Sequence, residues 1–113
     1  MDLINYNDFA KVKLKVGRII SAEDIAGKDK LYLVKVDLGE EKPKTLFAGI
    51  KKYYSKEELA GKTVIVVANL ESKRMGSVVS EGMLLAASIK EGDDEKIALL
   101  EPDKEMPSGA DIY

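Results

Sequence analysis

The chain has 113 residues, no cysteine, no histidine and a formal net charge of −2. This length suits one compact domain with its own core, and the missing residue types exclude disulfides, zinc sites built from cysteine and histidine, and imidazole catalysis. The opening residues lack the basic and apolar pattern of a signal peptide, and no apolar run is long enough to span a bilayer. We therefore expect a soluble, cytoplasmic protein without a membrane partner.

Charge is distributed unevenly along the chain. Residues 91–113 carry a net charge of −6, and residues 1–90 carry +4. The first ninety residues can therefore present a phosphate-binding surface, although the acidic segment is equally well explained as a solvated surface.

The elements before residue 50 are mainly strands. Residues 5–10 predict a short helical turn capped by Asn5 or Asn7. Residues 12–16 alternate apolar and basic side chains and predict a strand, which continues to residue 25 after a bulge or bend at Gly17. A polar turn at 26–30 and strands at 31–38 and 44–50 follow.

A short helix separates these strands from the rest. Ser55 and Glu58 form a capping-box pattern, and Gly61 ends the helix. Residues 63–68 predict a strand buried on both faces. A polar loop at 71–82, a fifth strand at 83–89, a short strand at 96–100 and a turn-rich tail complete the chain.

This order of elements is typical of the oligonucleotide-binding (OB) barrel. We predict an all-β, five-stranded OB fold with a short helix between strands three and four, a short N-terminal helix and a C-terminal β extension. The whole of 1–113 is expected to be one domain, with an N-terminal dimerisation segment at 1–11, the barrel at 12–90 and the extension at 91–113.

Three groups of residues are candidates for binding phosphate or nucleic acid. For the comb Lys11, Lys13 and Lys15, followed by Arg18, the pattern favours a solvated strand face. The turn around Lys28 and Lys30 fits a phosphate contact or an ordinary surface turn. In the loop at 71–82, the basic, hydroxyl and thioether side chains suit contacts to phosphate, sugar or base, but a plain turn and core packing explain them too. Its candidates are Lys73, Arg74, Met75, Ser80 and Met83.

The aromatic residues give weaker indications of a binding site. Tyr53 and Tyr54 suit stacking on bases, but packing beside the helix is favoured. We find no catalytic constellation, and we expect no enzyme activity in this chain alone, no cofactor and no metal.

Residues 8–19, with the sequence DFAKVKLKVGRI, resemble the opening of the tRNA-binding domain family. The resemblance continues in collinear order through Asp29-Lys30-Leu31, Ala48-Gly49-Ile50, residues 67–70 and Ser80-Glu81-Gly82-Met83, and it covers nearly the whole chain. This family includes the C-terminal domain or beta subunit of methionyl-tRNA synthetases and free-standing structure-specific tRNA-binding proteins.

The resemblance implies a non-catalytic OB module that recognises folded tRNA by shape and assists aminoacylation as part of methionyl-tRNA synthetase. It implies tRNA as partner, the catalytic part of the synthetase as a further partner, and a homodimer formed by the N-terminal segment and the C-terminal extension. We assign the tRNA contacts to Lys30, Asn69, Lys73, Arg74, Ser80 and Met83, with Lys28 and Lys35 as additional phosphate contacts.

The sequence departs from the family pattern at Ser72, where proline is frequent, at Lys15, where arginine is usual, and at Gly76-Ser77. Two alternatives remain: a free-standing tRNA-binding homodimer, and a polypeptide-binding secretion chaperone that shares the barrel. If Ser80 contacts tRNA, its replacement by alanine is expected to weaken binding several-fold and to leave the melting temperature nearly unchanged.

Overall fold

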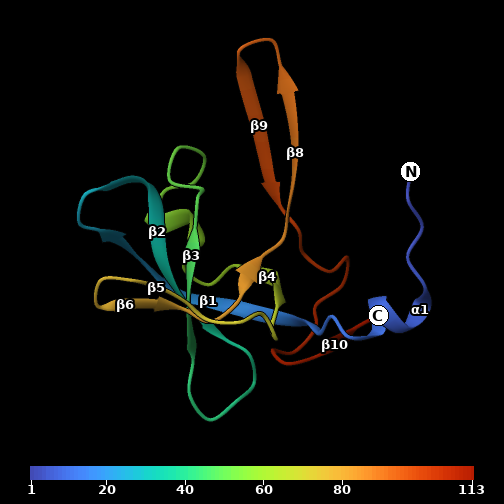
Figure 1. Ribbon diagram of the computed structural model, residues 1–113. Coiled ribbons are helices and arrows are strands. Elements are labelled where there is room, and N and C mark those ends of the chain that lie inside the picture. Colours follow the sequence, from blue (N-terminus) through green and yellow to red (C-terminus); the bar gives the residue numbers. More distant parts are fainter.

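The computed structural model describes residues 1–113 and is mostly β-structure, as predicted (Figure 1). The central sheet has the order β3-β2-β1-β4-β7, and all of these neighbours are antiparallel. A short helix, α2 (Lys56–Leu59), lies between β3 and β4 in the chain, which is the element order of an OB fold. The strands of this sheet are β1 (Leu14–Ile25), β2 (Lys28–Asp37), β3 (Lys44–Ala48), β4 (Thr63–Val67) and β7 (Met83–Leu84).

The two edges of this curled sheet meet through a short segment and not through a strand ladder. The Glu81 N–H donates to the Thr45 carbonyl oxygen at 2.8 Å, and the Phe47 N–H donates to the Ser80 hydroxyl oxygen at 2.9 Å. These bonds join β3 to the residues just before β7. Inside lies one apolar core, whose fully buried members are Ile19, Val34, Val36, Leu46, Leu59, Val64 and Val66.

Both predicted helix caps form. The Ser55 hydroxyl accepts from the Glu58 N–H at 3.1 Å, and the Glu58 carboxylate accepts from the Ser55 N–H at 2.9 Å. These bonds satisfy two N–H groups that a helix start leaves unpaired. In α1 (Tyr6–Ala10) the cap is Asn5, whose side chain accepts from the Asp8 N–H.

The irregularity expected at Gly17 lies elsewhere. Gly17 keeps a regular register opposite Val64, and the shift in the β1–β2 pairing falls between Ile19 and Ser21. Gly17 is needed for another reason, because a Cβ atom there would lie 2.6 Å from a methyl group of Val36. Close packing inside the curled sheet, not a bulge, therefore requires this glycine.

Two segments expected as turn or loop are tighter than predicted. The turn between β1 and β2 is only Ala26–Gly27, so Lys28 and Lys30 lie on β2. The expected loop at 71–82 contains a hairpin of β5 (Lys73–Met75) and β6 (Val78–Ser80). Gly27 and Gly76 have φ angles of 75° and 60°, which short hairpin turns favour and other residues rarely adopt.

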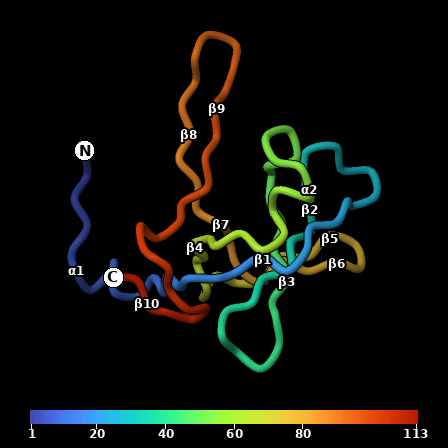
Figure 2. Tube along the Cα trace, turned by 180° about the vertical axis from the view of Figure 1, so that it is seen from behind, coloured from blue at the N-terminus to red at the C-terminus, as the bar shows by residue number.

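The fifth strand expected at 83–89 is split. Its first part is β7, and the Leu85 N–H makes a further bond to the Ile65 carbonyl oxygen at 3.0 Å. From residue 86 the chain leaves the barrel and forms the hairpin of β8 (Ala86–Glu91) and β9 (Asp94–Leu99), which projects into solvent (Figures 1 and 2). The boundary that we expected after residue 90 thus lies near the tip of this hairpin.

The C-terminal tail returns to the barrel, where β10 (Asp111–Ile112) pairs with the start of β1. The Gly109 N–H donates to the Val16 carbonyl oxygen at 2.7 Å, and the Val16 N–H donates to the Ala110 carbonyl oxygen at 2.9 Å. Gly109 lies against Gly39, and both have positive φ angles. The tail therefore ends beside α1, and the C-terminus lies near the N-terminal segment (Figures 1 and 2).

Candidate functional site

A groove of about 320 Å³ lies between the outer face of β2 and β3 and the β5–β6 hairpin. Leu31 and Phe47 belong to this outer face, because residues 32, 46 and 48 beside them are buried on the inner face. Of the six residues assigned as tRNA contacts, Lys73, Ser80 and Met83 line the groove, together with the further candidate Met75. The full lining is Leu31, Phe47, Leu70, Glu71, Lys73, Met75, Ser80, Gly82 and Met83.

Phe47 and Leu31 were not among the predicted site residues. A signal for Phe47 was present in the sequence, since period-two alternation along residues 44–48 places it opposite to Leu46. Its cross-strand neighbour on β2 is Leu33, so the outer face carries an apolar patch at this point.

Ser80 is buried, and its hydroxyl group makes one accepted and one donated hydrogen bond within the protein. The oxygen accepts from the Phe47 N–H at 2.9 Å, and the hydroxyl donates to the Gly82 carbonyl oxygen at 3.1 Å. A hydroxyl has only one hydrogen to donate, so Ser80 has none left for a ligand. The side chain thus links β3 to the segment before β7 beside the groove, and its predicted contact with tRNA stays a prediction.

We therefore expect Ser80→Ala to lower stability, in contrast to the unchanged melting temperature expected from the sequence. The variant leaves the Phe47 N–H and the Gly82 carbonyl without partners in a buried place, which costs about 1–3 kcal/mol. Urea unfolding of the variant measures this loss. The matched control is Ser88→Ala on the exposed strand β8, which we expect to change stability by less than about 0.5 kcal/mol. Equal stability of both variants would contradict this role of Ser80.

The two basic residues of the hairpin face in different directions. Lys73 and Met75 both line the groove, whereas Arg74 lies between them on β5 and is absent from the lining. Side chains alternate along a strand, so Arg74 is on the opposite side of the hairpin. Met83 is 46 % exposed at the groove, although its backbone pairs with Val67 in the central sheet.

The predicted phosphate-binding cations are free of ion pairs. Lys30 directly precedes Leu31 of the groove, and Lys35 shares the outer face of β2 with Leu33. No carboxylate lies within ion-pair distance of any of Lys28, Lys30, Lys35, Lys73 and Arg74. Their charges are therefore available to an external anion.

The N-terminal lysine comb, by contrast, is engaged within the protein. Lys15 pairs with Asp111 at 2.7 Å, and Lys11 pairs with Asp8 at 3.5 Å. The Lys13 amine donates to the Ala10 carbonyl oxygen at 3.2 Å. The hydrogen bond and charge of Lys15 hold the pKa of the Asp111 carboxyl below its usual range. The expected strand face is only partly present, because β1 begins at Leu14 and not at residue 12: Lys15 lies on the strand, Lys13 precedes it and Lys11 caps α1.

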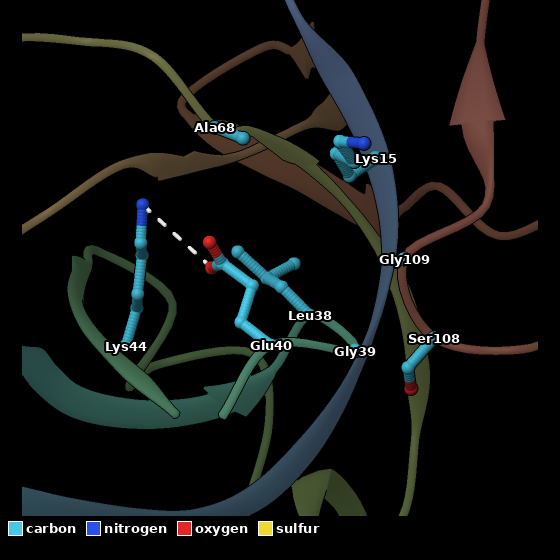
Figure 3. A pocket seen from close by; sticks show the side chains of 8 residues that line it. All are labelled: Lys15, Leu38, Gly39, Glu40, Lys44, Ala68, Ser108 and Gly109. Atoms are coloured by element: carbon cyan, nitrogen blue, oxygen red, sulfur yellow. Dashed lines mark ion pairs between the residues drawn. The ribbon is translucent and has the colours of Figure 1, made fainter. Parts of the chain in front are cut away.

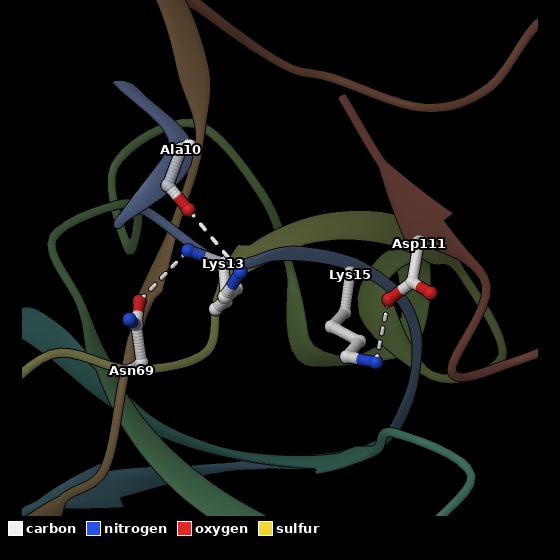
Figure 4. Close-up of polar contacts among 5 residues, drawn as sticks. All are labelled: Ala10, Lys13, Lys15, Asn69 and Asp111. Carbon is white, nitrogen blue, oxygen red and sulfur yellow. Dashed lines mark hydrogen bonds and ion pairs between the residues drawn. The ribbon is translucent and has the colours of Figure 1, made fainter. Parts of the chain in front are cut away.

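Asn69 joins the N-terminal segment to the barrel (Figure 4). Its side-chain oxygen accepts from the Lys13 N–H at 2.9 Å, the bond drawn in Figure 4. Its amide nitrogen also donates to the Lys11 carbonyl oxygen at 2.6 Å. The residue thus fixes the chain between α1 and β1. Its predicted contact with tRNA stays a prediction, and one N–H and one lone pair of the side-chain amide remain to make it.

A second, polar cavity of about 350 Å³ lies where the tail crosses β1 (Figure 3). Its two amines, on Lys15 and Lys44, are each paired with a carboxylate, Lys44 with Glu40 at 3.8 Å. We assign no chemistry to it. No group of three or more metal-ligating side chains is close enough to hold an ion, and neither helix is long and apolar enough to cross a membrane.

Three comparisons with known proteins each find related sequences or structures. Residues 14–111 match the family described as putative tRNA binding domain. Over 112 residues, or 99% of the chain, the sequence is 54% identical to methionine–tRNA ligase of Pyrococcus horikoshii, of which it covers only 15%. A methionyl-tRNA synthetase related protein of the same organism has a similar structure, with a TM-score of 0.86 at 37% identity and full coverage of both chains. The chaperone CsaA of Bacillus anthracis has a TM-score of 0.84 at 30% identity, over 99% of this chain and all of that one.

The element order, the curled sheet and the groove on its outer face define the chain as an OB-fold domain. The family match over residues 14–111 and the 54% identity to a methionine–tRNA ligase also show the family. The chain belongs to the tRNA-binding domain family and is homologous to a segment of methionyl-tRNA synthetases. The resemblance noted in the sequence is thereby confirmed.

Proposed function

We propose that this chain is a non-catalytic module that binds folded tRNA and assists aminoacylation by methionyl-tRNA synthetase, as a domain or as a separate subunit. The observation that supports it most is the groove at Phe47, Lys73 and Met83, with unpaired cations at Lys30 and Lys35 on the same sheet. Phosphates would meet the amines, and the ribose and base would meet the apolar lining.

A comparison of three ligands tests this function. In gel-shift titrations we expect folded tRNA to bind at least about tenfold more tightly than unstructured RNA of equal length, because the recognition is of shape. Unfolded polypeptide is the third ligand, since the fold is shared with a CsaA chaperone. Preference for the polypeptide would overturn the tRNA proposal and favour the chaperone alternative. Adding the chain to a synthetase catalytic part that lacks it should raise kcat/KM for tRNA.

We also propose that two copies of the chain form a dimer through the N-terminal segment and the C-terminal extension. None of the side chains of α1 is buried, and Leu3, Ile4 and Tyr6 are largely exposed. Beside them lies an apolar groove of about 500 Å³, lined by Phe9, Val12, Leu14, Ile112 and Tyr113 among others. An exposed apolar cluster of this kind is typical of a subunit interface.

Analytical ultracentrifugation checks the dimer. We expect the parent chain to sediment as a dimer at micromolar concentration, and the triple variant Leu3→Ser, Ile4→Ser and Tyr6→Ser to sediment as a monomer with an intact barrel. Far-UV circular dichroism of the variant provides the control for folding. A monomeric parent chain would contradict the dimer and leave the tRNA proposal untouched.

A further inference from the structure

The groove is lined mainly by apolar side chains. Phe47 and Leu31 form its wall on the sheet, and Met75 and Met83 lie on the hairpin side. Met83 and Leu70 are each nearly half exposed, so these apolar atoms meet solvent when no ligand is present. A ligand that fills this space gains the hydrophobic contact that the chain alone leaves unmade.

The polar groups in the groove are not arranged to form hydrogen bonds with the edge of a nucleobase. Its only hydroxyl, on Ser80, is spent on Phe47 and Gly82. A Cβ atom at Gly82 would lie 2.8 Å from the Val67 carbonyl oxygen, so no side chain fits there. The remaining charged groups, on Glu71 and Lys73, lie on the chain leading into and along the hairpin. The groove therefore suits contact with the face of a ligand.

The charges of the lysines near the groove indicate which kind of ligand would bind there. Lys73 lines the groove, Lys35 lies on the outer face of β2 and Lys30 directly precedes Leu31, and none of the three amines has a carboxylate partner. A nucleotide combines an apolar ring face with a phosphate, and so complements both the lining and the cations. An apolar peptide side chain would satisfy only the lining.

We propose that this groove holds one unstacked nucleobase of the bound RNA, with the Phe47 ring as its stacking partner and the Met75 and Met83 thioethers against its other side. Any of the four bases can stack on the face of an aromatic ring, so the groove does not recognise a particular sequence. It recognises instead a base that is free to leave the RNA helix. The inference rests on the proposed tRNA binding and adds the kind of RNA feature that the groove receives.

Substitution of Phe47 tests the stacking. We expect Phe47→Leu to weaken tRNA binding about 5- to 30-fold, the loss of one base–aromatic stack. Phe47→Tyr keeps the ring and should bind within about twofold of the parent. Met75→Ala, on the exposed hairpin, is the second variant if Phe47→Leu does not fold, and should weaken binding several-fold. Melting temperatures of all variants serve as the folding control.

A defined RNA probe reports on the base directly. The probe is an RNA hairpin with a single bulged 2-aminopurine, whose fluorescence is quenched on stacking, and the same hairpin without the bulge is its control. We expect the parent to bind the bulged hairpin more tightly and to quench it, and Phe47→Leu to do neither.

The outcomes separate the two proposals. If the parent fails to bind any tRNA, the proposed function is wrong. If the parent binds tRNA and both Phe47→Leu and Met75→Ala bind it equally well, the base-binding groove is wrong while the function stands. If Phe47→Leu weakens the binding of unfolded polypeptide but not of tRNA, the groove is a peptide site and the inference is overturned.

Discussion

Removing two of the predicted phosphate-binding cations, in the double variant Lys30→Ala and Lys73→Ala, is expected to weaken tRNA binding about tenfold to hundredfold at moderate salt. Neither amine has a carboxylate partner in the protein, so each is free to neutralise a phosphate. Each phosphate contact contributes slightly less than one unit to the slope of log affinity against log salt. The slope should therefore become shallower by about two units, which a gel-shift series at increasing salt measures.

A control of equal charge distinguishes local contacts from the overall field. Lys90 lies on the projecting β8 strand and Lys104 in the tail, and both are exposed. Replacing these two by alanine changes the net charge by the same amount. We expect this control to change affinity by less than about threefold, because neither lysine lines the groove and salt screens exposed charges that make no direct contact. Equal losses in the two double variants would show that only net charge matters and would remove the groove from the tRNA model.

Gly109→Ala is expected to destabilise the fold by about 2–4 kcal/mol, the largest stability effect that we predict for one added methyl group. Gly109 has a φ angle of 92°, which costs other residues strain, and its added Cβ would lie 2.7 Å from the Leu38 carbonyl oxygen. The tail crosses the turn at Leu38 and Gly39, just after β2, and it cannot move away from this turn without breaking its backbone hydrogen bonds to Val16. Urea unfolding measures the change in free energy.

Gly92→Ala is the matched control for this change. Gly92 also has a positive φ angle, 66°, but nothing lies within 4 Å of an added Cβ at the tip of the β8–β9 hairpin. We expect it to cost only the conformational strain, about 1 kcal/mol. The difference between the two variants isolates the steric contact. If both lose the same free energy, the crossing of tail and strand is looser than the structure indicates.

Short-range patterns in the sequence predicted the local structure well. The capping box at Ser55 and Glu58 depends on groups three residues apart, and it forms as expected. The nearly continuous run of valine and isoleucine along residues 63–68 predicted a strand buried on both faces, and residues 64–67 of β4 are buried. The resemblance to the tRNA-binding domain family, together with the order of strands and helix, was sufficient for the fold class.

The site depended on contacts that no local pattern contains. From the sequence, Ser80 is expected to be a turn residue with a free hydroxyl. In the structure this hydroxyl binds the N–H of Phe47, which is 33 residues away in the chain. Asn69 likewise reads as a loop amide, but it binds the backbone of Lys11 and Lys13. Arg74 and Lys73 look equivalent in sequence, and only the pairing of the hairpin puts them on opposite sides.

The sequence by itself determined the elements, the fold class and the positions of the charges, because strand alternation, helix capping and charge are properties of neighbouring residues. Tertiary structure alone decided where the fifth strand leaves the barrel at residue 86, and which side chains share the groove. The physical reason is competition for hydrogen bonds. Residues 86–91 find their partners in residues 94–99 and not in the barrel, and Ser80 finds its partners across the seam between β3 and β7. Such choices depend on which distant groups the folded chain brings within bonding distance.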